Sequence, residues 1–189
     1  MGLIRRTFKY LVPYIFSKLF KTVVRPHLEY GASVWSPYLK KDIREIEAVQ
    51  RRATKQINNL KDMSYRERLE SLRLPNLLYR RGRGDMIECY KLLNGKYDPE
   101  VSNVLTLHNQ ATETHRTRGH SLKLYTGKHR VNQSKYFFSN RVTRLWNALP
   151  EKIVRAVSTN SFKNLLDDHW ANFDIIYDFD KSIDFFYPE

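Results

Sequence analysis

The stretch from Leu77 to Leu93 reads LLYRRGRGDMIECYKLL, and it decides the fold class of this chain. Wound at 100° per residue, it separates apolar from charged side chains. The apolar side carries Leu78, Gly82, Met86, Cys89, Tyr90 and Leu93. The opposite side carries Arg80, Arg81, Gly84, Glu88 and Lys91. The pattern predicts a two-faced helix over 77–93, with one side suited to a core and the other to anions.

The segments before this helix show the same division. Between Leu39 and Leu60 apolar residues recur every three or four positions, which predicts a long helix with Arg51, Arg52 and Lys55 on its polar side. Ser64 and Glu67 have the spacing of a capping box, which predicts the start of a short helix. Further helices are expected over 1–11 and 15–25, separated by Pro13 and ending before Pro26.

The helical period disappears between Lys96 and Ser134, and we interpret this segment as a long irregular arm. A turn at Thr126-Gly127 would allow a short β-hairpin over 121–132. The expected fold is therefore mainly α. It consists of a helical bundle over 1–95, the arm over 96–134, a pair of helices over 135–173 and a mobile acidic tail over 174–189.

The charge of the chain is strongly positive. Its 189 residues include 33 Lys and Arg against 20 Asp and Glu, a formal net charge of +13. Such a balance is typical of proteins that meet nucleic acid or an anionic surface. No uninterrupted apolar stretch is long enough to span a membrane, so no membrane partner is expected. Cys89 is the single cysteine, which excludes an internal disulfide and fits an intracellular location, in nucleus or cytoplasm.

Motifs for catalysis or cofactor binding are absent from the sequence. It has no Walker loop, no G-x-S-x-G and no H-E-x-x-H. His108, His115, His120 and His129 would be the candidates for a metal site, but their spacing matches no helical ligand pair. The densest acids lie in the expected tail, where nothing would hold them rigid for metal-dependent chemistry. We therefore expect no enzymatic activity, no metal and no cofactor for this chain alone.

Three basic clusters are the better candidates for a functional surface. The first is Arg51, Arg52 and Lys55; the second is Arg80, Arg81 and Lys91; the third is Arg116 and Arg118 on the arm. The plain alternative is that each is a solvated surface without a ligand. Few acids lie beside them, and arginine can bind phosphate through two parallel hydrogen bonds. We therefore predict that these eight residues contact nucleic acid.

A series of motifs in a fixed order resembles the C-terminal part of non-LTR (LINE-type, jockey- and CR1-like) retrotransposon reverse transcriptases. The match runs from about Phe8 to Trp170. The motifs are Val24 to Tyr30 (VRPHLEY), Val34 to Tyr38 (VWSPY), Glu47 to Thr54 (EAVQRRAT), Tyr79 to Lys91, Arg116 to His120 (RTRGH), Phe137 to Val142 (FFSNRV), Leu145 to Pro150 (LWNALP) and Ser161 to Lys163 (SFK). Gly82 departs from the pattern, because a larger residue such as leucine is expected there.

The resemblance implies a polymerase thumb and the region that follows it. The catalytic aspartates of such enzymes lie in the upstream palm, within a Tyr/Phe-x-Asp-Asp turn that this sequence does not contain. The chain is thus expected to hold RNA or an RNA–DNA duplex without catalysing polymerisation, and Mg²⁺ would be needed only in the complete parent enzyme.

Two alternatives to this function remain open. One is a protein-interaction scaffold, whose apolar faces over 15–34 would meet a missing palm domain or a second copy. The other is a decayed element copy with no selected function.

Overall fold

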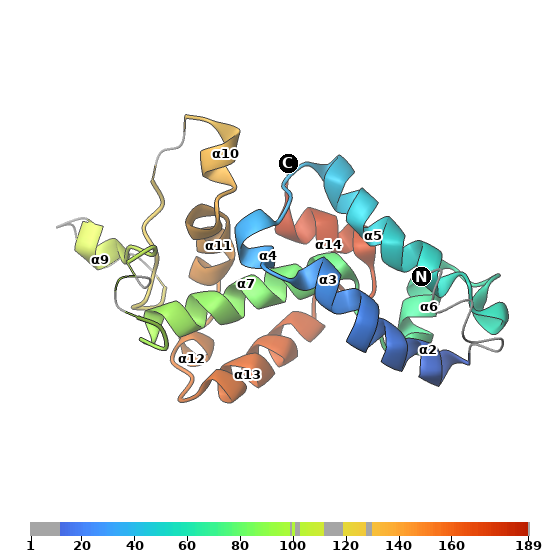
Figure 1. Cartoon of the computed structure of the whole chain (residues 1–189). Helices are drawn as coiled ribbons and strands as arrows, with labels where there is room; N and C mark the ends of the chain where they lie inside the picture. The colour runs from blue at the N-terminus through green and yellow to red at the C-terminus, as the bar shows by residue number, and fades with distance from the viewer. Residues whose placement is uncertain (1–11, 99, 101–102, 112–118, 128–129, 189) are drawn as a thin grey trace. The chain divides into compact units, whose positions relative to one another are not determined.

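The computed structural model describes residues 12–98, 100, 103–111, 119–127 and 130–188 (Figure 1). The predicted fold class is confirmed, because the described chain is mainly α-helical. Its β pairing is limited to an isolated antiparallel bridge between Leu107 and Leu124. The expected hairpin over 121–132 is therefore wrong: Leu124, which is buried, pairs with a residue of the preceding segment and not with one after Thr126. No helix in the described ranges is long and apolar enough to cross a membrane.

The chain divides into two compact units whose boundary falls inside one helix. Unit 1 consists of Met1–Arg81 with Phe173–Glu189, and unit 2 is Gly82–Asn172. The helix α7, Leu77–Leu93, has the bounds predicted from sequence and contributes residues to both units. This division differs from the four segments expected above, since the arm belongs to unit 2 and the acidic C-terminal segment belongs to unit 1.

Unit 1 is built from short helices and the first turns of α7. In chain order they are α2 Pro13–Leu19, the π-helical turn η1 Phe20–Val24, α3 Arg25–Glu29, α4 Ala32–Trp35, α5 Lys40–Thr54, the 3₁₀ turn η2 Asn58–Leu60, α6 Tyr65–Leu72 and α14 Phe179–Phe186. The predicted capping box of α6 is confirmed: Glu67 N–H donates to the Ser64 hydroxyl, and Ser64 N–H donates to the Glu67 carboxylate. The predicted helix over 1–11 lies outside the described residues.

The helical backbone does not end before Pro26, as the sequence suggested, but continues through it. The wider turn of η1 places the Arg25 N–H on the carbonyl of Phe20, five residues earlier. Pro26 then occupies the first turn of α3. A proline is tolerated there because the N–H it lacks would have had no partner within that helix.

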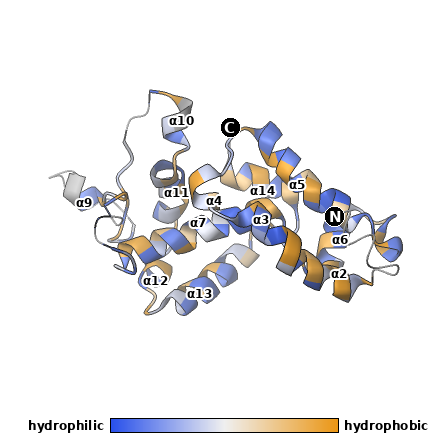
Figure 2. Ribbon diagram, viewed as in Figure 1, coloured by the Kyte–Doolittle hydropathy of each residue, from blue (hydrophilic) through white to orange (hydrophobic). Residues whose placement is uncertain are grey.

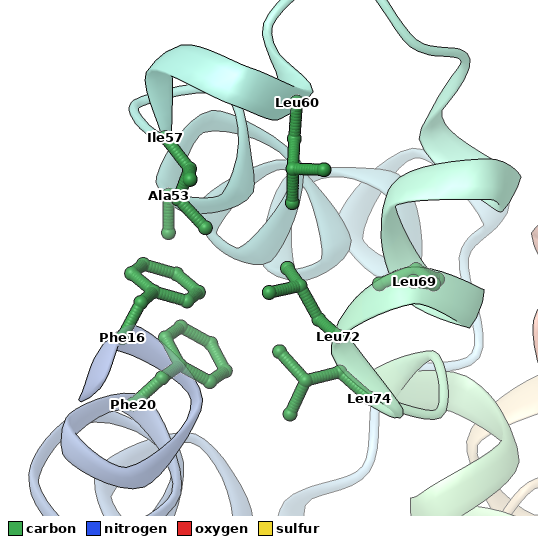
Figure 3. Packing of buried hydrophobic residues seen from close by; sticks show 8 residues of the cluster. All are labelled: Phe16, Phe20, Ala53, Ile57, Leu60, Leu69, Leu72 and Leu74. Atoms are coloured by element: carbon green, nitrogen blue, oxygen red, sulfur yellow. The ribbon is translucent and has the colours of Figure 1, made fainter. Parts of the chain in front are cut away.

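One hydrophobic cluster of unit 1 lies between α2 with η1 and the segment from α5 to α6 (Figure 3). Phe16 and Phe20 stack with their ring centroids 5.7 Å apart; Phe16 points toward Ala53 and Ile57, and Phe20 toward Leu72 and Leu74 (Figure 3). Leu72 at the end of α6 closes another side of the cluster. Since Phe16 and Phe20 are each 1% exposed, this packing determines which side of α2 and η1 faces the solvent.

The acidic C-terminal segment is not a mobile tail. It forms α14, whose N-terminus is capped by the Asp178 carboxylate accepting from the Lys181 N–H. Phe179 and Ile183 are 5% and 3% exposed and pack with Ile43 of α5 and Leu78 of α7. The acids occupy the outer side of the helix, so the charge pattern alone resembled a solvated tail, while the buried residues depend on contacts with distant elements.

This packing makes a testable prediction. Replacing Ile183 with alanine is expected to lower the free energy of unfolding by about 2–4 kcal/mol, because a buried side chain would leave a cavity. Urea denaturation followed by circular dichroism measures the change. Asp184→Ala is the control, since Asp184 is exposed on the same helix. If both substitutions left stability unchanged, the segment would be a mobile tail after all.

Two side chains cap the N-terminus of α7. The side-chain oxygen Oδ1 of Asn76 accepts from the Tyr79 N–H at 2.7 Å, and the Glu47 carboxylate accepts from the Leu77 N–H at 2.9 Å. Asn76 also donates to the backbone oxygen of Ile175 at 2.8 Å, which connects the start of α7 with the segment before α14. The first N–H groups of a helix have no partners within it. Here Glu47 of α5 and Asn76, which directly precedes α7, supply them.

Unit 2 is also helical. Besides most of α7 it contains α9 His108–Ala111, α10 Asn132–Lys135, α11 Phe138–Asn147, α12 Glu151–Val154 and α13 Thr159–Ala171. Its core centres on Trp146, which is fully buried and lies 6.0 Å from the ring of Phe162. Phe162 in turn stacks on Tyr90 of α7 at 4.5 Å. Two carboxylate–guanidinium pairs, Arg83 with Asp167 and Asp85 with Arg141, connect α7 to α13 and α11.

Candidate nucleic-acid interface

Helix α5 presents a row of cations to the solvent. Its buried side carries Ile43, Gln50 and Ala53, and the opposite side is exposed. Hydrophilic and hydrophobic residues accordingly alternate along this helix (Figure 2). Side chains three and four positions apart lie on one side of a helix, so the exposed cations form one row. We call it the α5 basic stripe; it consists of Lys41, Arg44, Arg51, Arg52 and Lys55.

The α5 basic stripe keeps most of its positive charge. At 1.5 Å per residue it is about 21 Å long. Glu45 is the one exposed carboxylate of α5, since Asp42 is half-buried and Glu47 is buried. None of the five cations pairs with a carboxylate of the described chain. Such a row of unneutralised charge attracts a polyanion.

Arg51 differs from the other members of the stripe because aromatic rings hold its guanidinium. The group lies 4.7 Å from the ring centre of Tyr65 and 5.9 Å from that of Phe179. The Tyr65 hydroxyl donates to the buried carboxylate of Glu47, which places the ring under Arg51. Arg51 therefore has a fixed position, while Arg44, Arg52 and Lys55 are free to follow a bound surface.

Glu47 is a carboxylate of α5 that lies in the core and not beside the cations of the stripe. It is 1% exposed. Burial raises the pKa of its carboxyl, and hydrogen bonds from Tyr65 and the α7 backbone together with the charge of Arg81 partly offset that rise. Burial and the same carboxylate raise the pKa of Tyr65. Glu47 is thus a structural group, and its burial leaves the stripe with less negative charge than the sequence suggested.

The second predicted cluster, on α7, is not an exposed basic surface. Arg81 is 3% exposed, so the prediction that it faces anions in solution is wrong. Arg80 is half-buried and forms a two-point ion pair with Glu29 of α3. Lys91 donates to Glu88 at 2.8 Å on its own helix. Packing over the first half of α7 explains the burial of Arg80 and Arg81, whereas Lys91 is in the last turn and pairs within its own helix.

Arg116 and Arg118, the third predicted cluster, lie outside the described residues. The segment directly after them is held by hydrogen bonds to α11. Trp146 donates from its indole N–H to the Leu122 carbonyl at 2.8 Å, and a ring nitrogen of His120 lies 3.0 Å from the Trp146 carbonyl. The Asn147 side chain makes two further hydrogen bonds with the backbone of Leu124. This part of the arm is a strap across the end of α11, so the histidine of the RTRGH motif has a structural role.

Sequence reasoning left two residues out of the predicted site. Lys41 and Arg44 belong to the α5 basic stripe by exposure and by helical spacing, and the same periodicity that selected Arg52 could have found them.

The described residues hold no group of three or more His, Cys, Asp and Glu side chains placed to bind a metal ion. His108 and His120 lie in the described part of the arm, and His120 is buried against Trp146. Cys89 is fully buried, and burial raises the pKa of its thiol well above the usual value. It therefore behaves as a small core residue, as its place on the apolar side of α7 predicted.

Comparisons of the chain with protein-family models, with curated proteins and with solved structures found no match. The case for its function therefore depends on the ordered sequence motifs and on the surface of α5.

Proposed function

We propose that this chain is the thumb and C-terminal region of a non-LTR retrotransposon reverse transcriptase, and that it binds an RNA–DNA duplex through the α5 basic stripe. The observation that carries the binding proposal is the row of five exposed, unpaired cations on one side of α5. The ordered motifs support the assignment to this class of protein. In this proposal the chain holds the duplex and supplies no catalytic group.

The stripe suits a nucleic-acid backbone better than a base sequence. Its members are long cationic side chains on a helix side about 21 Å in length, which matches a run of successive phosphates. The shallow minor groove of an A-form duplex exposes backbone and 2′-hydroxyls, so proteins recognise it mainly by shape and phosphate contacts. The proposed binding is therefore electrostatic and largely independent of sequence.

A salt titration tests this proposal. We expect the logarithm of the association constant for a 20-base-pair RNA–DNA duplex to fall linearly with the logarithm of salt concentration. If the stripe neutralises about five phosphates, the slope is about −4 to −5. Fluorescence anisotropy with a labelled duplex measures it, and duplexes of unrelated sequence should give the same value. Absence of binding even at low salt would exclude the proposal.

A second candidate function, a protein-interaction scaffold, is favoured by exposed apolar side chains in the segment after α3. Tyr30 and Val34 are each 86% exposed, and Trp35 is 42% exposed. Self-association through these residues would give a molar mass, by light scattering, that rises with protein concentration. A rise that added duplex leaves unchanged, together with no duplex binding, would replace the first proposal with this one.

A further inference from the structure

A second group of cations lies in unit 1 on elements other than α5. Lys21, Arg25 and Glu29 follow one another at four-residue intervals along η1 and α3. Arg25 lies 3.5 Å from the Glu29 carboxylate. Arg80 of α7 pairs with the same carboxylate, with its Nη2 2.9 Å from Oε2. One carboxylate therefore holds two guanidinium groups, each from a different element.

A fourth cation joins them from the end of α6. Arg73 follows Leu72 directly, and the Ser17 hydroxyl donates to the Leu72 carbonyl at 3.2 Å, which holds the end of α6 against α2. Burial lowers the pKa of the Lys21 ammonium, and the charges of Arg25, Arg80 and Arg73 lower it further. No carboxylate raises that pKa. The charges of the three arginines thus act on Lys21, and two of them, Arg25 and Arg80, pair with Glu29.

Two members of this group lie in unusual backbone conformations. Arg73 is in the left-handed region, with φ 48° and ψ 47°, at a helix end where glycine is the usual residue. Lys21 lies in the π-helical turn η1, a rare conformation that occurs often at functional sites. A glycine at position 73 would end α6 without strain. Residues in such conformations cluster at active sites and ligand-binding sites.

We infer that Lys21, Arg25, Arg73 and Arg80 form a phosphate-binding site, in which Glu29 positions the two arginines. A ligand phosphate would relieve the repulsion among the four cations, and it would bind through charge-assisted hydrogen bonds from the guanidinium groups. The phosphate belongs either to a nucleic-acid backbone or to a free polyphosphate. This site is separate from the α5 basic stripe and does not depend on the function proposed for that stripe.

The variant Arg73→Gly tests the inference because its two expected effects have opposite signs. Without ligand it should raise the melting temperature by a few degrees, since it relieves a left-handed arginine and removes a like charge. With tripolyphosphate as the probe it should weaken binding by roughly tenfold, the effect of losing one charged hydrogen bond. Thermal melts and calorimetric titrations measure the two effects. A merely structural role would change stability but not affinity.

Four further variants complete the experiment. Arg73→Lys keeps the charge and should keep most of the affinity, while Lys61→Gln removes an exposed cation elsewhere in unit 1 and should change nothing. A variant that neutralises the α5 basic stripe should still bind tripolyphosphate, which separates failure of this inference from failure of the proposed function.

If Arg73→Gly also weakens duplex binding, the source of the phosphate is a nucleic-acid backbone. If duplex binding is unchanged, the source is a free polyphosphate. Unchanged tripolyphosphate affinity in both Arg73→Gly and Lys21→Gln, or no binding of it to the unaltered chain, would overturn the inference.

Discussion

Replacing Arg44, Arg52 and Lys55 together with glutamine is expected to weaken binding of an RNA–DNA duplex on the order of 10²–10³-fold at 0.1 M salt. Each phosphate that a cation neutralises releases condensed counterions, so each lost contact removes about one power of ten at that concentration. The salt slope should become shallower by about 3 at the same time. Arg51 is left in place because it packs over Tyr65 and its replacement would also disturb the core.

The control for this variant must remove the same charge elsewhere. Lys61, Lys135 and Lys152 are exposed and lie outside α5, so replacing these three with glutamine changes the net charge equally. We expect this control to lose less than about tenfold in affinity, since only the general attraction decreases. Circular dichroism should show the same helix content in both variants. Equal losses in the two variants would mean that net charge, and not the stripe, accounts for binding.

Replacing Glu47 with alanine is expected to lower the free energy of unfolding by about 3–5 kcal/mol. The substitution leaves the buried Tyr65 hydroxyl and the Leu77 N–H without their acceptor, and each lost partner costs about 1–3 kcal/mol. It also removes the negative charge beside the buried Arg81. Chemical denaturation measures the change. Glu45→Ala, on the exposed side of the same helix, should cost less than about 0.5 kcal/mol.

The pH dependence gives this prediction a second readout. Because burial raises the pKa of Glu47 above its unfolded value, the contribution of this carboxyl to stability is fully present below the unfolded pKa, about 4.3, and decreases as the pH rises through the folded value. The difference in unfolding free energy between the unaltered chain and Glu47→Gln should therefore move in favour of the unaltered chain as the pH falls to about 4. A difference that stays constant with pH would contradict the burial of this carboxyl.

The parts of the fold that were predicted correctly depend on local chemistry. The helix α7 has its predicted bounds because an asparagine precedes it and Gly95, at φ 62°, follows it. The start of α6 is set by a capping box that spans four residues. These signals act between neighbours in the chain, so they are readable without knowledge of the fold.

The parts that were wrong depend on which surfaces meet. The helix predicted over 39–60 ends at Thr54, and a 3₁₀ turn at Asn58–Leu60 follows, because Ile57 and Leu60 turn back into the cluster around Phe16. The tail becomes α14 only because Ile43 and Leu78 cover its apolar side. For the candidate site, the periodicity of α5 located the stripe. Residue spacing did not indicate that Glu47 of α5 and Arg81 of α7 are buried.

By itself the sequence determined the helical fold class, the bounds of α7 and the basic side of α5, since these depend on residue spacing and on caps within a few positions. The first signal for this fold, the two-faced pattern from Leu77 to Leu93, was right about the helix and wrong about its charged side. Only the tertiary structure decided whether the charged side of α7 is exposed, because a charged side chain is solvated or paired according to what packs over it. The same contacts leave the stripe on α5 exposed and place Arg25 and Arg80 on one carboxylate, that of Glu29.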